Sequence, residues 1–279
     1  MEETTNKPKI LVGTSGWSYP KGEGTWNGTF YPKGERDELS YYSQHFKTVE
    51  INSSFYAPLS PDYASRWVDK TPADFVFSVK LWQKFTHPKM FEASSGQPAV
   101  ISQADVELFR KGIEPIRASG KLGPVLVQFP PSFENNVYGW QILGAVLDTF
   151  KDLSLAIELR HFSWSRHPRT EQVLREYNVA WVQTDEPRFS ISSAEELPLT
   201  ANFAYFRFHG RNREYWWTGN NETRYKYLYS EEELKELLNR VGNAASKSAK
   251  VFVYFNNHWR GDAPKNAAQF EILSAPYSK

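Results

Sequence analysis

The fold is decided by a strand–helix–strand stretch, residues 125–160, which reads VLVQFPPSFENNVYGWQILGAVLDTFKDLSLAIELR. Short apolar runs rich in β-branched and aromatic residues at 125–129 and 155–160 predict two strands. Between them, residues 137–150 have the length and apolar spacing of an amphipathic helix. A strand, a helix and a second strand in this order are typical of a parallel sheet, in which the chain must cross back before it pairs again.

The same alternation continues in both directions along the chain. Further strands are predicted at 10–14, 48–52, 75–80, 179–184, 204–209 and 251–256. Further helices are predicted at 37–46, 61–70, 103–118, 169–177 and 230–246, with a last one after Pro264. Only the connection 185–203 is weak, because it offers at best a short helix near Ser193–Glu196.

Eight strands that alternate with helices in 279 residues predict an α/β protein, a single-domain (β/α)8 barrel of the TIM type that spans residues 1–279. We expect residues 1–8 to form a flexible tail. An open, doubly wound sheet would need a glycine-rich phosphate loop after the first strand. The segment Gly13-Thr14-Ser15-Gly16-Trp17 lacks the required spacing and has a bulky Trp where the backbone would approach a phosphate. The barrel is therefore favoured.

Composition limits the classes of function. The formal net charge is +1, which argues against a protein whose main task is to coat nucleic acid or an anionic membrane. The chain has no cysteine, so disulfides, thiolate metal sites and a cysteine nucleophile are excluded. The polar start resembles no signal peptide, and no apolar stretch approaches the roughly 20 residues of a membrane helix. We expect a soluble, cytoplasmic protein without a membrane partner.

Several predicted strands alternate apolar and polar side chains, although strands covered on both faces are usually apolar throughout. Since the apolar set must contact the surrounding helices, we expect the polar set to point into the barrel, near the carboxyl ends of the strands. The charges of this set nearly balance: Glu50, Glu158 and Asp185 against Lys80, Arg160 and Arg207. They could form a closed network of ion pairs without a ligand. Because such a network contributes little stability, we favour a ligand site.

A set of motifs distributed over the chain resembles one family. The motifs are GTSGWSY (13–19), WNGTFYP (26–32), VEINSSFY (49–56), TH (86–87), QFPPS (128–132), ELRHFSW (158–164), RFHG (207–210) and YFNNH (254–258). Together they resemble the YecE-like family, a domain of unknown function with the number seventy-two. The resemblance implies a TIM-type barrel and supplies no reaction. The chain departs from the family pattern at Gly34-Glu35-Arg36, before the first predicted helix.

The polar set contains the groups that acid–base catalysis requires. We predict Glu158, Asp185 and His209 as catalytic residues, with His87 in reserve. The predicted substrate-binding residues are Asn52, Lys80, Gln128, Arg160, Arg207, Arg211, Asn256 and Asn257. Cationic side chains would hold an anionic group, and the amides would bind hydroxyls or amides. The working hypothesis is an enzyme without redox cofactor that acts on a small anionic or polyhydroxyl substrate.

Alternatives remain open at this level. Glu50, Glu158, Asp185, His209 and His258 are ligands that could bind a metal, but the neighbouring cations disfavour it, and we predict no metal and no cofactor. A glycosidase could use Glu50 and Glu158 as its two carboxylates. A non-catalytic protein that binds nucleic acid or another ligand is the alternative of a different class. Residues 207–227 interleave Arg with Tyr and Trp, a pattern that suits phosphate contacts and base stacking in nucleic acid. The favoured interpretation of this segment is a lid over the barrel.

Overall fold

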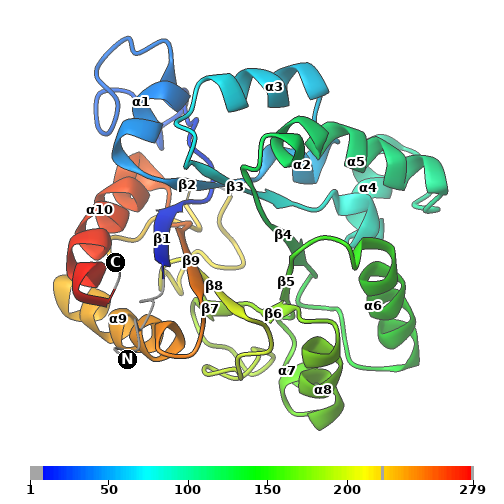
Figure 1. Ribbon diagram of the computed structural model, residues 1–279. Coiled ribbons are helices and arrows are strands. Elements are labelled where there is room, and N and C mark those ends of the chain that lie inside the picture. The colour runs from blue at the N-terminus through cyan, green and yellow to red at the C-terminus, as the bar shows by residue number, and fades with distance from the viewer. Residues whose placement is uncertain (1–8, 221–222, 278–279) are drawn as a thin grey trace, which may run out of the picture. The chain divides into compact units, whose positions relative to one another are not determined.

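The computed structural model describes residues 9–220 and 223–277 (Figure 1), so the tail predicted for residues 1–8 lies outside the described residues. Its strands are β1 (Lys9–Thr14), β2 (Thr48–Ile51), β3 (Val76–Lys80), β4 (Leu122–Gln128), β5 (Leu155–Glu158), β6 (Ala180–Trp181), β7 (Gln183–Asp185), β8 (Phe203–Phe208) and β9 (Lys250–Phe255). They form a four-stranded sheet of order β1-β9-β8-β7 and a five-stranded sheet of order β2-β3-β4-β5-β6. The pairs β1/β9, β9/β8, β8/β7, β3/β4, β4/β5 and β5/β6 are parallel. The predicted parallel α/β class is confirmed.

Most predicted helices are present within a residue or two of their expected bounds. The α-helices are α1 (Glu38–His45), α2 (Ser53–Tyr56), α3 (Pro61–Asp69), α4 (Pro88–Ser95), α5 (Gln103–Ala118), α6 (Val137–Phe150), α7 (Phe162–Ser165), α8 (Pro168–Glu176), α9 (Glu231–Ala245) and α10 (Asp262–Ser274). Short 3-10 turns are η1 (Gln83–Phe85), η2 (Trp259–Gly261) and η3 (Ala275–Tyr277). The decisive stretch of the sequence forms β4, α6 and β5, drawn in green in Figure 1.

Side-chain caps explain where the longer helices begin. Ser102 and Asp105 form a reciprocal capping box at the start of α5, and Ser230 and Glu233 do the same for α9. Each box satisfies backbone N–H groups that have no partner within the helix. At α6, the side chain of Asn136 accepts a hydrogen bond from the backbone of Gly139. These signals lie in the sequence itself, which is why the three helices match their predicted bounds.

Three details differ from the prediction. The strand expected at 179–184 is interrupted at Val182: Ala180–Trp181 pairs with β5, whereas Gln183–Asp185 pairs with β8, so that nine strands replace eight. The short helix near Ser193–Glu196 is absent: residues 193–194 have no regular structure, residues 195–196 form a bend, and Ser192 forms an antiparallel bridge with His161. Helix α10 begins at Asp262, before Pro264, since a first-turn proline removes no helical hydrogen bond.

The described residues fall into two compact units. The first contains the residues through Thr48, Val182–Arg188 and those from Ala201 onward. The second contains Val49–Trp181 and Phe189–Thr200. Each unit is built around one of the two sheets, and each is treated separately below. The prediction of a single domain stays a prediction.

The first unit packs α10 against β1 and α9. The buried hydroxyl of Tyr42 joins two of its segments: it accepts a hydrogen bond from the backbone N–H of Thr14 at 2.9 Å and donates one to the carbonyl of Thr48 at 3.1 Å. The Thr48 hydroxyl lies 2.7 Å from that of Tyr254, the next-to-last residue of β9. A tyrosine hydroxyl thus satisfies backbone groups that a direct strand pair would otherwise satisfy.

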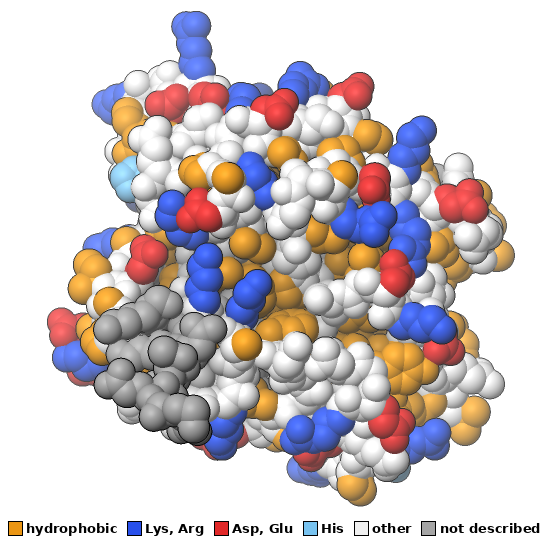
Figure 2. All heavy atoms as spheres, viewed as in Figure 1, with side chains coloured by type: hydrophobic (Ala, Val, Ile, Leu, Met, Phe, Trp, Pro, Cys, Tyr) orange, Lys and Arg blue, Asp and Glu red, His pale blue; other side chains and the backbone are white. Residues whose placement is uncertain are grey.

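The second unit packs α3 against α5 outside its sheet. This approach is close, because a Cβ atom on Gly112 of α5 would lie 2.6 Å from the carbonyl oxygen of Leu59. Three of the apolar residues in its strands, Val125, Leu126 and Ile157, are fully buried. On the face of the molecule seen in Figure 2, acidic and basic side chains are interspersed, in keeping with the near-zero net charge.

Candidate functional site

Three of the predicted site residues end neighbouring strands of the second unit. Lys80 is the last residue of β3, Gln128 of β4 and Glu158 of β5. Gln128 is aligned with Glu158, and Lys80 with Leu126. Because the three strands are parallel and adjacent, these side chains leave the sheet at the same edge. The predicted alignment of polar groups at the carboxyl ends is therefore present here.

Arg160 and Glu158 form an ion pair at the end of β5, with Arg160 Nε 3.6 Å from Glu158 Oε1. The Glu158 side chain is buried, whereas the Arg160 side chain is 12% exposed. The carbonyl of Arg160 also accepts a hydrogen bond from the backbone of Ser193. This hydrogen bond holds the backbone of Arg160 in place, and so helps to position its side chain.

Lys80 is placed by the residues that follow β2. Its ammonium lies 4.0 Å from the centroid of the Phe55 ring, a cation–π contact. The hydroxyl of Ser54 donates a hydrogen bond of 2.6 Å to the carbonyl of Lys80. Asn52 lies at the N-cap position of the same short helix, α2, and is half-buried. The segment Asn52–Tyr56 thus supports both the side chain and the backbone of Lys80.

His87 lies against the same aromatic ring, its own ring 5.0 Å from that of Phe55 and perpendicular to it. Its Nδ1 lies 2.8 Å from the hydroxyl of Thr86. Burial, followed by the charges of Lys80 and Arg160, lowers the pKa of His87 to about 3. The ring is therefore neutral near pH 7, and the charges that act on it make the local electrostatic potential positive. Such a potential favours an anion.

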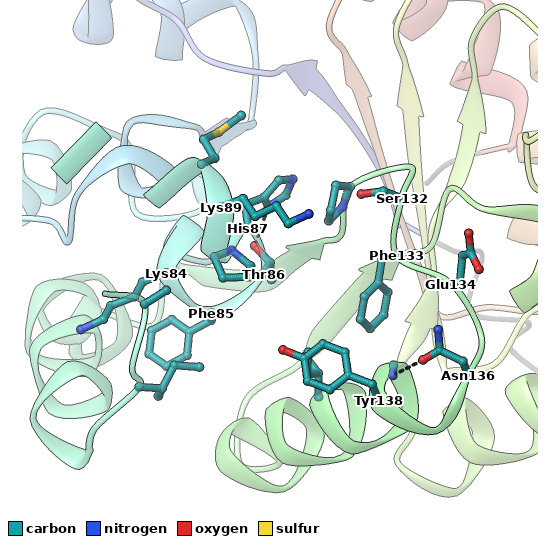
Figure 3. A pocket seen from close by; sticks show the side chains of 17 residues that line it. Lys84, Phe85, Thr86, His87, Lys89, Ser132, Phe133, Glu134, Asn136 and Tyr138 are labelled. Carbon is teal, nitrogen blue, oxygen red and sulfur yellow. Dashed lines mark hydrogen bonds between the residues drawn. The ribbon is translucent and has the colours of Figure 1, made fainter. Parts of the chain in front are cut away.

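A pocket of about 510 Å³ opens beside His87, entirely within the second unit. One wall is the segment 84–90 and the other runs from Pro130 to Ile142 (Figure 3). In Figure 3, Phe133 and Tyr138 point toward the space between the walls, whereas Lys84 points away from it. Lys84 instead pairs with Asp105 at 2.7 Å. The volume lies within the range of about 300–1,000 Å³ that is usual for small-molecule sites.

In the first unit, Asp185 at the end of β7 is already engaged. It accepts hydrogen bonds from Arg211, at 3.0 Å from both Nε and Nη2, and from the hydroxyl of Tyr229 at 2.8 Å. Arg240 lies 3.9 Å away. Burial and Asp185 raise the pKa of Tyr229, so this hydroxyl keeps its proton. The carboxylate is thus a buried anchor, and its role in proton transfer stays a prediction.

The two arginines predicted to bind substrate in this unit are also enclosed. Arg211 contacts Glu233 at 3.2 Å and Glu236 at 3.4 Å in addition to Asp185, so three carboxylates offset its charge. Arg207 is buried within β8 and is aligned with Tyr254 of β9. Both side chains are better placed to hold the unit together than to bind an incoming anion, and their role in substrate binding stays a prediction.

His209 and the two asparagines lie next to one another at the ends of β8 and β9. The Asn256 side-chain nitrogen lies 2.9 Å from Nδ1 of His209. Asn257 donates to the carbonyl of Tyr227 at 2.8 Å and to Asn266 at 2.9 Å. The rings of Trp216 and Tyr225 lie about 6 Å from that of His209. The roles of His209, Asn256 and Asn257 stay predictions.

The alternatives gain little support. Within residues 9–220 and 223–277 there is no group of three or more His, Asp or Glu placed to bind a metal ion. In the segment proposed for nucleic acid, Arg207 and Trp216 are buried and Arg211 is paired with acids. Exposed cations and rings remain at Arg213, Tyr215 and Trp217, so this alternative also stays a prediction.

Sequence reasoning missed the partners that place these groups. The aromatic support of Lys80 by Phe55 and the bond between Tyr229 and Asp185 join residues 25 or more positions apart, and neither pattern is visible in a sequence. The pocket wall from Pro130 to Ile142 was also missed. Its signal was the motif QFPPS at 128–132, which begins at the end of a strand and contributes Pro130 and Ser132 to the lining.

The comparison with family models decides the identity of the chain. The family described as "Protein of unknown function DUF72" matches residues 11–277. The chain belongs to the DUF72 family. The YunF protein of Bacillus subtilis, described as UPF0759, is 32% identical over 281 residues, which cover 96% of each chain. The YecE protein of Escherichia coli is 25% identical over 169 residues, or 59% of this chain and 53% of YecE. The YecE-like resemblance of the motifs is confirmed.

Solved structures of DUF72 proteins have the same fold. A DUF72 family protein of Thermotoga maritima has a TM-score of 0.82 and 35% identity, with 95% of this chain and 98% of that chain covered. One of Enterococcus faecalis has a TM-score of 0.80 and 27% identity, with 95% and 94% covered. Among the described residues, no helix is long and apolar enough to cross a membrane. These relatives carry no assigned reaction, so function must be argued from the site.

Proposed function

We propose that this DUF72 protein is an enzyme that binds a small anionic substrate at the carboxyl ends of β3, β4 and β5. Lys80 and Arg160 hold the anionic group, and Gln128 and Asn52 donate or accept hydrogen bonds to its neighbouring polar atoms. The observation that carries the proposal is the position of His87, a half-buried ring whose pKa is lowered by burial and then by the charges of Lys80 and Arg160. A site with a positive potential at a neutral base suits the binding and deprotonation of an anion.

The two cations contribute differently. The planar guanidinium of Arg160 can donate two parallel hydrogen bonds to a phosphate or carboxylate, while the ammonium of Lys80 acts as a compact charge. Glu158 keeps the guanidinium in place through the 3.6 Å contact. An incoming anion therefore meets donors whose positions are already set by Glu158 and Phe55, which reduces the entropy lost on binding.

Proton transfer is assigned to His87 and Glu158. At pH 7 the imidazole of His87 is unprotonated. An anion bound by Lys80 and Arg160 offsets the two charges that lower the pKa of this ring and so makes it a stronger base. The buried carboxylate of Glu158 lies next to the cation that would hold the substrate. The reaction class is acid–base chemistry without a redox cofactor, which includes hydrolysis, elimination and isomerisation. The (β/α)8 barrel predicted from the sequence is part of the proposal.

The proposal is tested by titrating the protein with inorganic phosphate in an isothermal titration calorimeter. Lys80→Met and Arg160→Gln are each expected to weaken binding at least tenfold. Matched controls are Lys70→Met at the end of α3 and Arg175→Gln, whose guanidinium pairs with Glu171 on the exposed face of α8. Both controls should bind phosphate within twofold of the unsubstituted protein. Phosphate affinity that is unchanged in Lys80→Met and Arg160→Gln would overturn the proposal.

Catalysis is tested separately once a panel of small phosphorylated and carboxylated compounds has yielded a turnover. Glu158→Gln and His87→Gln are each expected to lower kcat by about 10²–10⁴-fold, as is usual when an acid–base group is removed. KM should change much less, because neither substitution removes a cation. A kcat within threefold of the unsubstituted value in both variants would exclude these groups from proton transfer.

A further inference from the structure

The pocket beside His87 is mainly apolar, unlike the strand ends it adjoins. Its lining includes Phe85, Met90, Ile101, Phe133, Tyr138 and Ile142. Three of these side chains, Met90, Ile101 and Tyr138, are 50%, 48% and 66% exposed although they are large and hydrophobic. Exposed apolar groups that gather around one cavity are typical of a binding site rather than of a random surface.

The walls of this pocket are preformed. Phe133 stacks on Phe129 with ring centroids 4.0 Å apart and on Trp164 at 5.2 Å. The indole of Trp164 also donates a hydrogen bond of 2.7 Å to the carbonyl of Phe133. On the opposite side, Phe85 packs edge-on against Phe150 at 5.3 Å. Because neither wall has to rearrange, an apolar group could be bound without a large loss of side-chain entropy.

The pocket adjoins the proposed anion site at His87. His87 lines the pocket and also contacts Phe55, the ring that supports Lys80. The opposite wall includes Pro130, which follows the end of β4 at Gln128 by two residues. Lys89 is a further exposed cation of the lining, and Figure 3 shows its side chain next to His87. The lining therefore has a cation at Lys89 beside His87, and its other polar side chains include Ser132, Glu134 and Asn136.

We propose that this pocket binds the apolar part of the substrate, so that the substrate is a small anion with an aromatic or branched aliphatic group. The inference rests on the proposed function, because Lys80 and Arg160 must hold the anionic end. It narrows the substrate class and disfavours bare phosphate and sugar phosphates, whose hydroxyls would lose hydrogen bonds to water against Phe133 and Ile142.

The test compares two sulfonates with the same charge, methanesulfonate and naphthalene-2-sulfonate, in calorimetric titrations. The unsubstituted protein is expected to bind the naphthalene compound at least tenfold more tightly. Tyr138→Ala and Ile101→Ala should each reduce this advantage at least threefold, and Ala99→Trp, which fills the cavity, should abolish it. The controls Val137→Ala and Val100→Ala alter neighbouring exposed residues that lie outside the lining, and they should have no effect.

Failure of the inference and failure of the proposed function give different results. If the two sulfonates bind with equal affinity and Lys80→Met weakens the binding of both, the proposed role of the pocket is overturned, whereas the proposed anion site is kept. A preference for the naphthalene compound that survives Tyr138→Ala, Ile101→Ala and Ala99→Trp would also overturn it. If uncharged 2-naphthol binds as tightly as naphthalene-2-sulfonate and Lys80→Met changes neither affinity, the link between pocket and anion is refuted together with the proposed function.

Discussion

Replacement of Asp185 by Asn tests whether this carboxylate is a structural anchor. The side chain is almost fully buried and accepts hydrogen bonds from Arg211 and Tyr229, with Arg240 at 3.9 Å. Asparagine has nearly the same shape but carries no charge, and its amide nitrogen would face a donor. One of the donors now bonded to the carboxylate would lose its acceptor, and Arg211 would lose the most buried of its three counter-charges.

The magnitude follows from the burial of the pair. Removal of one partner from a buried ion pair costs about 3–5 kcal/mol, because the other charge is left without compensation. The contacts of Arg211 with Glu233 and Glu236 place the expected loss at the lower end, about 3 kcal/mol. Since about 1 kcal/mol shifts the melting temperature of a chain of this size by roughly 2–4 °C, Asp185→Asn should lower Tm by about 6–12 °C.

Urea unfolding followed by tryptophan fluorescence measures this loss, with Tm from circular dichroism as a second readout. The control is Glu236→Gln, which removes a carboxylate from the same guanidinium but at a position that is 66% exposed. It should cost less than about 0.5 kcal/mol, as expected for exposed ion pairs. A loss below about 1 kcal/mol in Asp185→Asn, or equal losses in the two variants, would refute the assignment of Asp185 as an anchor.

Two further predictions concern stability. The folded protein holds the pKa of His87 near 3, below the ordinary value of 6.5, so the unfolded chain binds more protons between these values and stability falls as the pH drops below about 6.5. The free energy of unfolding, measured with urea, should therefore decrease less between pH 7.5 and pH 4.5 in His87→Gln than in the unsubstituted protein. Equal decreases in the two proteins would contradict this prediction. Tyr42→Phe leaves the buried N–H of Thr14 and carbonyl of Thr48 without their bonds and should cost about 1–3 kcal/mol. Tyr177→Phe, whose hydroxyl bonds the exposed Asp148, should cost under about 0.5 kcal/mol, and a similar small value for Tyr42→Phe would refute its bridging role.

The parallel α/β class and most element bounds could be predicted because their causes are local. Apolar runs set the strands, and caps such as Ser102 and Ser230 set the starts of helices. The interruption of the strand at Val182 could not be predicted, because it depends on β6 pairing with β5 and β7 pairing with β8. The failure at Ser193 has the same origin: Ser193 bonds to the carbonyl of Arg160 and Ser192 pairs with His161, and both partners are distant in the sequence.

The candidate site was predictable in kind but not in detail. Period-2 alternation placed Lys80, Gln128 and Glu158 at strand ends, and the structure aligns them. Alternation says nothing about which charges are already paired, and Asp185, named as a catalytic group, proves to have Arg211 and Tyr229 as partners. His87 lies outside any strand, and the signal for it was its position in the loop 84–89, which follows the third predicted strand.

The most direct test of the central claim is a crystal structure of the protein grown in the presence of selenate, with data collected at the selenium absorption edge. The account predicts an anomalous peak at the carboxyl ends of β3–β5, with Lys80 and Arg160 donating hydrogen bonds of about 2.7–3.2 Å to its oxygens. The peak should disappear in Arg160→Gln and persist in Arg175→Gln. Full-occupancy selenate elsewhere on the chain, with none at Lys80 and Arg160, would contradict the account.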